Sequence, residues 1–169
     1  MLSAPKYFPG MGAASQSTEE GPVQVGLSLE DLTARDLVPF EAAIRAGAPA
    51  IQIGHGLYAT DDFVTPASLS KTITTDLLRD RLGFKGVAIT DDLSAPAVTA
   101  VAPVPEAAVS AIKAGADLLF ISRPQGQQEA AYLAVLNAVR KGNIPRKRID
   151  EALLRVLTAK RRLGLIQGG

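Results

Sequence analysis

The chain has 169 residues, of which 47% are hydrophobic and 21% charged, and its formal net charge is +1. This length suits one domain over residues 1–169, and the composition excludes a disordered or collagen-like chain. No apolar run approaches the ~18 residues of a membrane-spanning helix. With no cysteine and a single histidine, His55, thiolate chemistry and multi-histidine metal sites are excluded. We expect no cofactor, no metal and no membrane partner.

The first residues lack the charged start and long apolar core of a secretory signal peptide. The sequence therefore leaves the compartment unknown. The protein is cytoplasmic by default, or secreted if this chain is cut from a longer precursor.

Basic residues gather near the end of the chain. Nine of the 18 lie between Arg140 and Arg162, where only Asp150 and Glu151 are acidic. Such a cluster can bind nucleic acid. Here, however, leucines and a valine are interleaved at helical spacing, and cations near the end of a helix interact favourably with its dipole. The pattern favours a solvated helix face, so we expect no nucleic-acid partner.

Short apolar runs alternate with longer amphipathic stretches along the chain. In chain order, the pattern predicts a strand end at Tyr7 and Phe8, a helix at 29–46, a strand at 50–54, a helix at 69–82, a strand at 86–90, a helix at 105–114, a strand at 117–122, and helices at 126–141 and 147–163. Ser70 and Asp150 are predicted to begin helices. Glycines are predicted to end them, at Gly47, Gly83, Gly115, Gly142 and Gly164. This alternation predicts βαβ units and a parallel sheet, which is an α/β fold.

Polar residues follow the predicted strands. They are found in the stretch from Lys6 to Gly12, at His55, at Asp91 and Asp92, and at Ser122 and Arg123. In parallel α/β folds, ligands bind at the carboxyl edge of the sheet. The clustering therefore favours an enzyme-like site over a plain scaffold.

Asp91 ends a buried strand. An ionised carboxylate is costly there without partners, which favours a functional role. Asp92 fits the alternative, a cap on the following segment. A long polar loop at 13–26 carries Glu19 and Glu20, which supply either a second carboxylate facing Asp91 or solvated surface charges. His55 is either a pocket residue or a structural donor. No nucleophile-elbow pattern supports a Ser-His-Asp triad.

Several motifs, in order and over nearly the whole chain, resemble the barrel domain of glycoside hydrolase family 3. The matching segments are 6–12, 36–40, 43–48, 65–70, 77–79, 82–93, 114–117 and 155–157. The β-N-acetylhexosaminidase branch, often tied to peptidoglycan or cell-wall turnover, is the most similar. The resemblance implies a carbohydrate substrate and a retaining hydrolysis in which Asp91 is the nucleophile of a covalent glycosyl-enzyme.

The resemblance also implies the other site residues. The family's Asp-Ser-His run falls on Ser17, Thr18 and Glu19, so Glu19 stands in the place of the acid/base histidine and is the candidate acid/base. Its sugar-contacting Lys-His pair falls on Lys6 and Tyr7. With His55, these two are the candidate substrate-binding residues.

A complete (β/α)8 barrel needs about 250 residues. The matching segments belong to the second half of the family's barrel, so we expect half a barrel, with strands five to eight and flanking helices. Half a barrel leaves sheet edges and the apolar interior open, which favours a homo-oligomer, a complementary half-barrel, or a place within a longer protein. The alternative function is a catalytically inactive half-barrel that serves carbohydrate binding or assembly.

Overall fold

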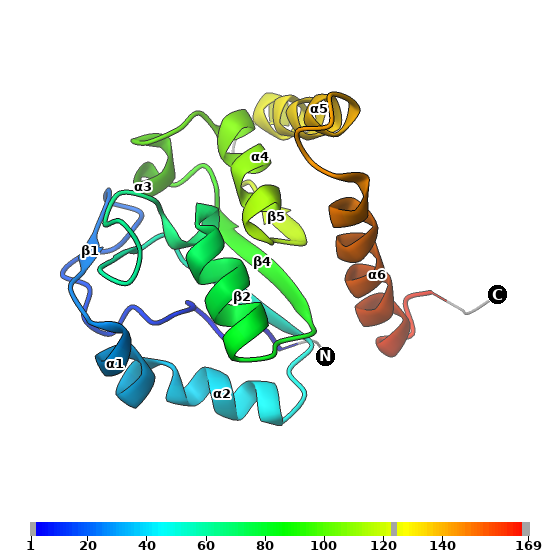
Figure 1. The fold of residues 1–169 in the computed structure, drawn as a ribbon. Helices are drawn as coiled ribbons and strands as arrows, with labels where there is room; N and C mark the ends of the chain where they lie inside the picture. Colours follow the sequence, from blue (N-terminus) through cyan, green and yellow to red (C-terminus); the bar gives the residue numbers. More distant parts are fainter. Residues whose placement is uncertain (1–2, 123–124, 167–169) are drawn as a thin grey trace.

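The computed structural model describes residues 3–122 and 125–166, and a parallel sheet lies at its centre (Figure 1). The strand order is β2 (Ala50–Ile53), β4 (Val87–Asp92) and β5 (Leu118–Phe120). Phe8 forms a parallel bridge with Ile53 on the other side of β2, and the Phe8 amide donates to the Gln52 carbonyl over 2.9 Å. Four parallel segments thus stand side by side. The predicted α/β fold, half of a barrel whose first strand is only a remnant, is confirmed.

The helices follow the predicted order, with local differences. They are α1 (Leu29–Asp31), the π-helical η1 (Leu32–Asp36), α2 (Val38–Arg45), the 3-10 turn η2 (Ala67–Leu69), the π-helical η3 (Thr72–Arg81), α3 (Pro96–Thr99), α4 (Val104–Ala114), α5 (Gln125–Arg140) and α6 (Arg146–Arg162). The prediction of a single helix at 29–46 is wrong, because the helix is interrupted at Leu37. Pro39 has no amide proton to continue the preceding helix, so it lies in the first turn of a new one.

The predicted helix ends are largely correct. The Ser70 hydroxyl accepts a hydrogen bond from the Ile73 amide at the start of η3, as predicted. Asp150 is wrong as a helix start, because α6 begins four residues earlier, after Pro145. All five predicted stop glycines have positive φ. At Gly115 the φ is 120° and a Cβ would lie 2.5 Å from the Thr75 hydroxyl, so only glycine fits.

Two short strands were not predicted. β1 (Gln24–Val25) pairs in parallel with β3 (Leu57–Tyr58) and forms a separate two-stranded sheet. Two residues are too few for a periodic pattern, and the pairing depends on chain segments that are distant in sequence. This small sheet holds the far end of the polar loop at 13–26, and the Thr18 carbonyl in the middle of the loop accepts a hydrogen bond of 3.1 Å from the Ala97 amide.

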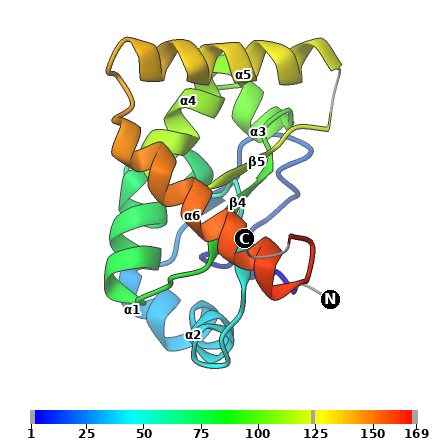
Figure 2. The same ribbon diagram turned by 90° about the vertical axis from the view of Figure 1, so that its right-hand side faces the viewer.

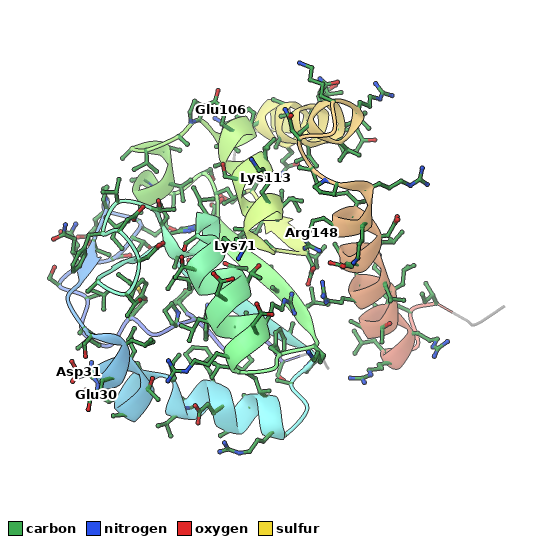
Figure 3. All side chains as sticks on the ribbon, in the orientation of Figure 1. Glu30, Asp31, Lys71, Glu106, Lys113 and Arg148 are labelled. Carbon is green, nitrogen blue, oxygen red and sulfur yellow. The ribbon has the colours of Figure 1, made fainter. Side chains whose placement is uncertain are left out.

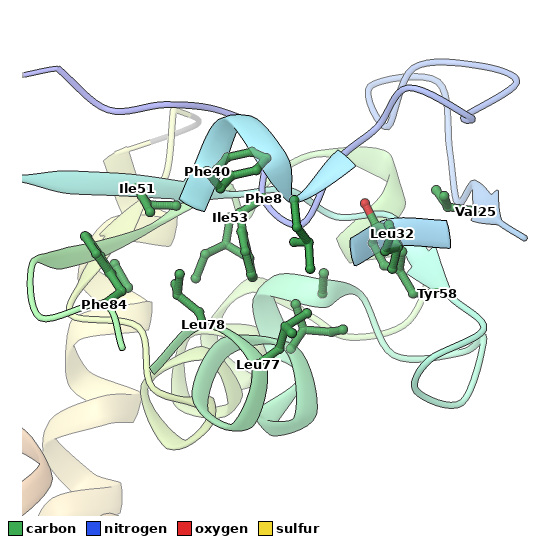
Figure 4. Close-up of a cluster of buried hydrophobic side chains, with 14 residues drawn as sticks. Phe8, Val25, Leu32, Phe40, Ile51, Ile53, Tyr58, Leu77, Leu78 and Phe84 are labelled. Atoms are coloured by element: carbon green, nitrogen blue, oxygen red, sulfur yellow. The ribbon is translucent and has the colours of Figure 1, made fainter. Parts of the chain in front are cut away.

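The main core lies between the sheet and the helices α2 and η3 (Figure 4). Ile51 and Ile53 point to this side of β2 and pack with Leu78 of η3. The rings of Phe8 and Phe40 meet edge to face, with centroids 5.2 Å apart. Since alternate residues of a strand face opposite ways, the neighbours of Ile51 and Ile53 face the barrel interior.

α6 packs against the amino ends of the strands, and in Figure 2 it crosses in front of β4 and β5. Its Val156 and Ala159 contact Ala50 and Val87, the first residues of β2 and β4. The predicted helical tail is confirmed. The leucines interleaved with its basic residues are largely exposed, however, and small residues make the contact instead.

Ion pairs also connect the amino ends of the strands to the helices around them. The buried Asp117 carboxylate lies 2.6 Å from Arg79, 2.7 Å from Arg148 and 3.1 Å from Arg155. Arg148 reaches it from α6 (Figure 3). Burial lowers the pKa of Arg79, against the effect of Asp117. The sequence pattern places Asp117 at the start of a predicted strand but does not indicate this cluster, because its partners are more than 30 residues away.

The interior face of the half-barrel is open, as expected. Leu118 and Phe120 of β5 are 41% and 48% exposed, and β5 is the outermost strand of its sheet. None of the described helices is long and apolar enough to cross a bilayer.

Candidate functional site

A cavity of about 320 Å³ lies at the carboxyl ends of β2 and β4. Its wall includes four of the five predicted site residues, namely Tyr7, Glu19, His55 and Asp91. A larger cavity of about 450 Å³ lies at the opposite, amino end, under α6. Its lining holds Lys85, Arg155 and Arg162 but no carboxylate, so the chemistry belongs to the smaller cavity.

Asp91 is the carboxylate of this cavity that the sheet holds in place. It is the next-to-last residue of β4 and is half-buried. Its Oδ1 accepts a hydrogen bond of 2.8 Å from the Gln52 side-chain amide. Among the described residues, no other side chain or amide is hydrogen-bonded to this carboxylate. It therefore keeps accepting capacity on the cavity side.

Asp92 is fully engaged with the protein. Its Oδ1 accepts from the Ser94 amide at 3.0 Å, the Ser94 hydroxyl at 2.6 Å and the Ser122 amide at 3.0 Å, and Oδ2 accepts from the Ser122 hydroxyl. Burial acts to raise the pKa of Asp92, but the hydrogen bonds from Ser122 and Ser94 outweigh it and lower the pKa. This carboxylate joins β4 to the segment after β5. It does not cap α3, which begins after Ala95 without a side-chain cap.

His55 is completely buried, and both ring nitrogens bind the protein. Nε2 lies 2.9 Å from the Asp92 carbonyl and Nδ1 lies 2.8 Å from the Ser68 hydroxyl. Because a carbonyl only accepts, Nε2 carries the proton and Nδ1 accepts from Ser68. Burial lowers the pKa of His55, although the nearby Asp91 charge acts to raise it. A neutral His55 therefore fixes the backbone beside Asp91, and neither nitrogen is left for a substrate.

The buried His55 predicts a pH dependence of stability. Its pKa is below the ordinary 6.5 in the folded protein, so the unfolded chain binds more protons as the pH falls. The free energy of unfolding should be highest above about pH 6.5 and should fall below it, by at most about 1.4 kcal/mol per pH unit from this group. Urea unfolding at pH 7.5, 6.5 and 5.5 measures the slope. The His55→Gln variant should be less stable, but its free energy of unfolding should change less with pH over this range. Equal pH slopes for the variant and the wild type would contradict the assignment of a neutral, buried His55.

The remaining predicted residues are less tightly placed. Glu19 is exposed on the loop, where its amide donates to the Ser17 hydroxyl over 3.2 Å, and it is one of the residues that line the cavity. Glu20 is exposed and not part of the lining. Tyr7 lies between this cavity and a neighbouring one of about 390 Å³. Lys6 lines only the neighbouring cavity, with its ammonium 4.9 Å from the centroid of the Tyr7 ring. Arg123 lies outside the described residues.

Sequence reasoning missed Gln52, Ser68, which binds His55, and Ser94, which binds Asp92 together with Ser122. Gln52 had a visible signal, since it is a polar residue in the middle of a short buried strand. Ser68 had none, because single serines are common in loops, whereas Ser122 was placed at the carboxyl edge by its position at the end of a predicted strand.

A parallel sheet with helices outside it and acidic residues around a cavity at its carboxyl edge is the arrangement of part of a (β/α) barrel domain. The model of the glycosyl hydrolase family 3 N-terminal domain matches residues 1–159. The chain belongs to glycoside hydrolase family 3.

Individual relatives agree with this assignment. An uncharacterized secreted glycosyl hydrolase of Arthroderma benhamiae is 37% identical over 96% of this chain and 47% of its own length. A beta-hexosaminidase of Stenotrophomonas maltophilia is 34% identical over 78% of this chain and 39% of its own. The family 3 beta-N-acetylglucosaminidase of Paenibacillus sp. FPU-7 superimposes with a TM-score of 0.96 at 36% identity, over 100% of this chain and 32% of that one. The chain thus spans less than half the length of these proteins.

Proposed function

We propose that the chain carries the nucleophile side of a retaining glycoside hydrolase that acts on β-linked N-acetylglucosamine or related sugars. The observation that carries this proposal is the contrast between neighbouring carboxylates. Asp92 is saturated by hydrogen bonds, whereas Asp91 accepts one and lines a cavity. A carboxylate that is held on one oxygen and open on the other suits nucleophilic attack.

The reaction has two steps. In the first, an Asp91 oxygen bonds to the anomeric carbon, the glycosidic bond breaks, and Glu19 gives its proton to the departing oxygen. In the second, Glu19 takes a proton from a water, whose oxygen attacks the anomeric carbon and releases Asp91. Glu19 lies on the loop at 13–26 and lines the same cavity as Asp91. Lys6 and Tyr7 contact the sugar from the neighbouring cavity.

The names of relatives support the sugar class. Those from Stenotrophomonas and Paenibacillus are called a beta-hexosaminidase and a beta-N-acetylglucosaminidase. The Arthroderma relative is called secreted, which supports secretion for this protein as well. A role in peptidoglycan or cell-wall turnover stays a prediction.

The test is hydrolysis of an aryl β-N-acetylglucosaminide and an aryl β-glucoside, with the configuration of the first-formed sugar followed by NMR. We expect faster turnover of the N-acetylglucosaminide with retained β-configuration. An α-configured first product would exclude the covalent mechanism. No turnover by the chain, alone or combined with a complementary half-barrel, would favour the alternative of an inactive half-barrel for binding or assembly.

We also propose that the open face is covered by a complementary half-barrel, either a second copy or another part of the same protein. The exposed Leu118 and Phe120 on the outermost strand support this, because an unpaired apolar edge drives association. The isolated chain should therefore sediment at twice the monomer mass or more. Phe120→Glu should shift it towards the monomer, and the matched Tyr132→Glu on the exposed face of α5 should not. A wild-type chain that stays monomeric at 100 µM would contradict self-association.

A further inference from the structure

Gln52 is the polar residue within the otherwise apolar strand β2. Its neighbours Ile51 and Ile53 pack into the core between the sheet and the helices, so Gln52 faces the interior of the half-barrel. In β4, Val87, Ile89 and Asp91 alternate in the same way. The register pairs Gln52 with Ile89, which places Asp91 one alternation further towards the carboxyl edge and on the same face. A side chain as long as glutamine spans that offset.

The backbone of Gln52 is held on the side away from Asp91. Its amide donates to the Pro5 carbonyl over 3.0 Å, and its carbonyl accepts from the Phe8 amide over 2.9 Å. The side chain is half-buried, and its Nε2 lies 2.8 Å from Asp91 Oδ1. A fixed main chain and a short hydrogen bond together restrict the rotation of the Asp91 carboxylate about its Cβ–Cγ bond.

We infer that Gln52 is a positioning residue, which holds Oδ1 of Asp91 and leaves Oδ2 as the atom that attacks the sugar. This inference rests on the proposed function. A neutral amide is suited to the task, since it fixes the carboxylate without neutralising the charge that makes it a nucleophile. A lysine or arginine in its place would form an ion pair with the nucleophile.

The hydrogen bond from Gln52 to Asp91 Oδ1 can persist through both steps of the proposed reaction. When Oδ2 bonds to the anomeric carbon and the glycosidic bond breaks, Oδ1 becomes the carbonyl oxygen of the resulting ester and still accepts from Nε2. When water attacks the anomeric carbon, the bond to Oδ2 breaks and its electron pair returns to the carboxylate. Gln52 donates to the oxygen that shares this returning charge, so its contribution should be larger in the transition state of the second step than in the covalent ester.

Kinetics test the role. Gln52→Met keeps the length of the side chain but removes the donor, and we expect kcat to fall between about tenfold and a hundredfold while KM changes less than about threefold. Gln52→Glu places a second carboxyl beside Asp91. Because two carboxyls so close share a proton, the acidic limb of the rate–pH profile should move up by at least about one pH unit.

The matched control is Gln24→Glu, the same change on an exposed position of β1, which should alter neither quantity. The inference would be overturned if the kcat of Gln52→Met were within about twofold of the wild-type value. It would also be overturned if the rate–pH profile of Gln52→Glu were the same as that of Gln24→Glu.

A measurement without turnover separates this inference from the proposed function. The side-chain amide signals of Gln52, assigned by their loss in Gln52→Met, should shift in one step on acidification as the Asp91 carboxylate is protonated. This pH-dependent shift should be absent in Asp91→Asn. Its absence in the wild type would overturn the contact between Gln52 and Asp91. If the shift is present but the wild type hydrolyses neither glycoside, the proposed function fails and the catalytic role of Gln52 fails with it, although the contact is confirmed.

Discussion

Asp91→Asn should reduce kcat for the aryl N-acetylglucosaminide by a factor on the order of 10⁴ or more, the largest effect that we expect on activity. An amide oxygen is too weak a nucleophile to form the glycosyl-enzyme at a comparable rate. The shape of the side chain is preserved, and its oxygen can still accept the Gln52 hydrogen bond. The loss should therefore appear without a large change in stability, which unfolding in urea would verify.

Asp92→Asn is the matched control, because it makes the same chemical change one residue further along β4. It replaces an oxygen that accepts from Ser122 with an amide group that cannot accept, so we expect it to cost about 1–3 kcal/mol of stability. Its effect on kcat should be smaller than that of Asp91→Asn by at least about a hundredfold. If Asp92→Asn were the inactive variant and Asp91→Asn the active one, the assignment of the nucleophile would be wrong.

Asp117→Ala should have the largest effect on stability, a loss of about 3–5 kcal/mol. Its carboxylate is completely buried and is the shared partner of Arg79, Arg148 and Arg155, and it also accepts from the Ala88 amide over 3.0 Å. Removing it leaves three guanidinium groups facing one another without a counter-charge. The measurement is urea unfolding followed by circular dichroism.

The consequence should be strongest at α6, which supplies Arg148 and Arg155. Limited proteolysis of Asp117→Ala should cut within α6 sooner than in the wild type. Asp150→Asn is the control, since this exposed carboxylate lies 4.0 Å from Arg146 and should change stability by less than about 0.5 kcal/mol. A loss below about 1 kcal/mol for Asp117→Ala would show that the arginines find other partners.

Local patterns in the sequence determined the fold class, most of the helices and strands, and the position of Asp91. Strand alternation and helical spacing depend on residues within one element, and glycines with positive φ end helices whatever lies around them. Asp91 was recognisable because it directly follows a buried apolar run at the edge where parallel strands end. The alternation of elements also indicated a parallel sheet, since parallel neighbours need a crossover connection.

Only the tertiary structure decided how each polar residue is used. Gln52 and Asp91 are 39 positions apart, and the arginines that bind Asp117 are 31 to 38 positions from it. The sequence favours Asp91 over Asp92 by position, but only folding brings Ser122, from the segment after β5, onto Asp92 and saturates it. Likewise, His55 is neutral and structural because burial and two distant partners make it so. Hydrogen bonds and burial of this kind arise between segments that only folding brings together.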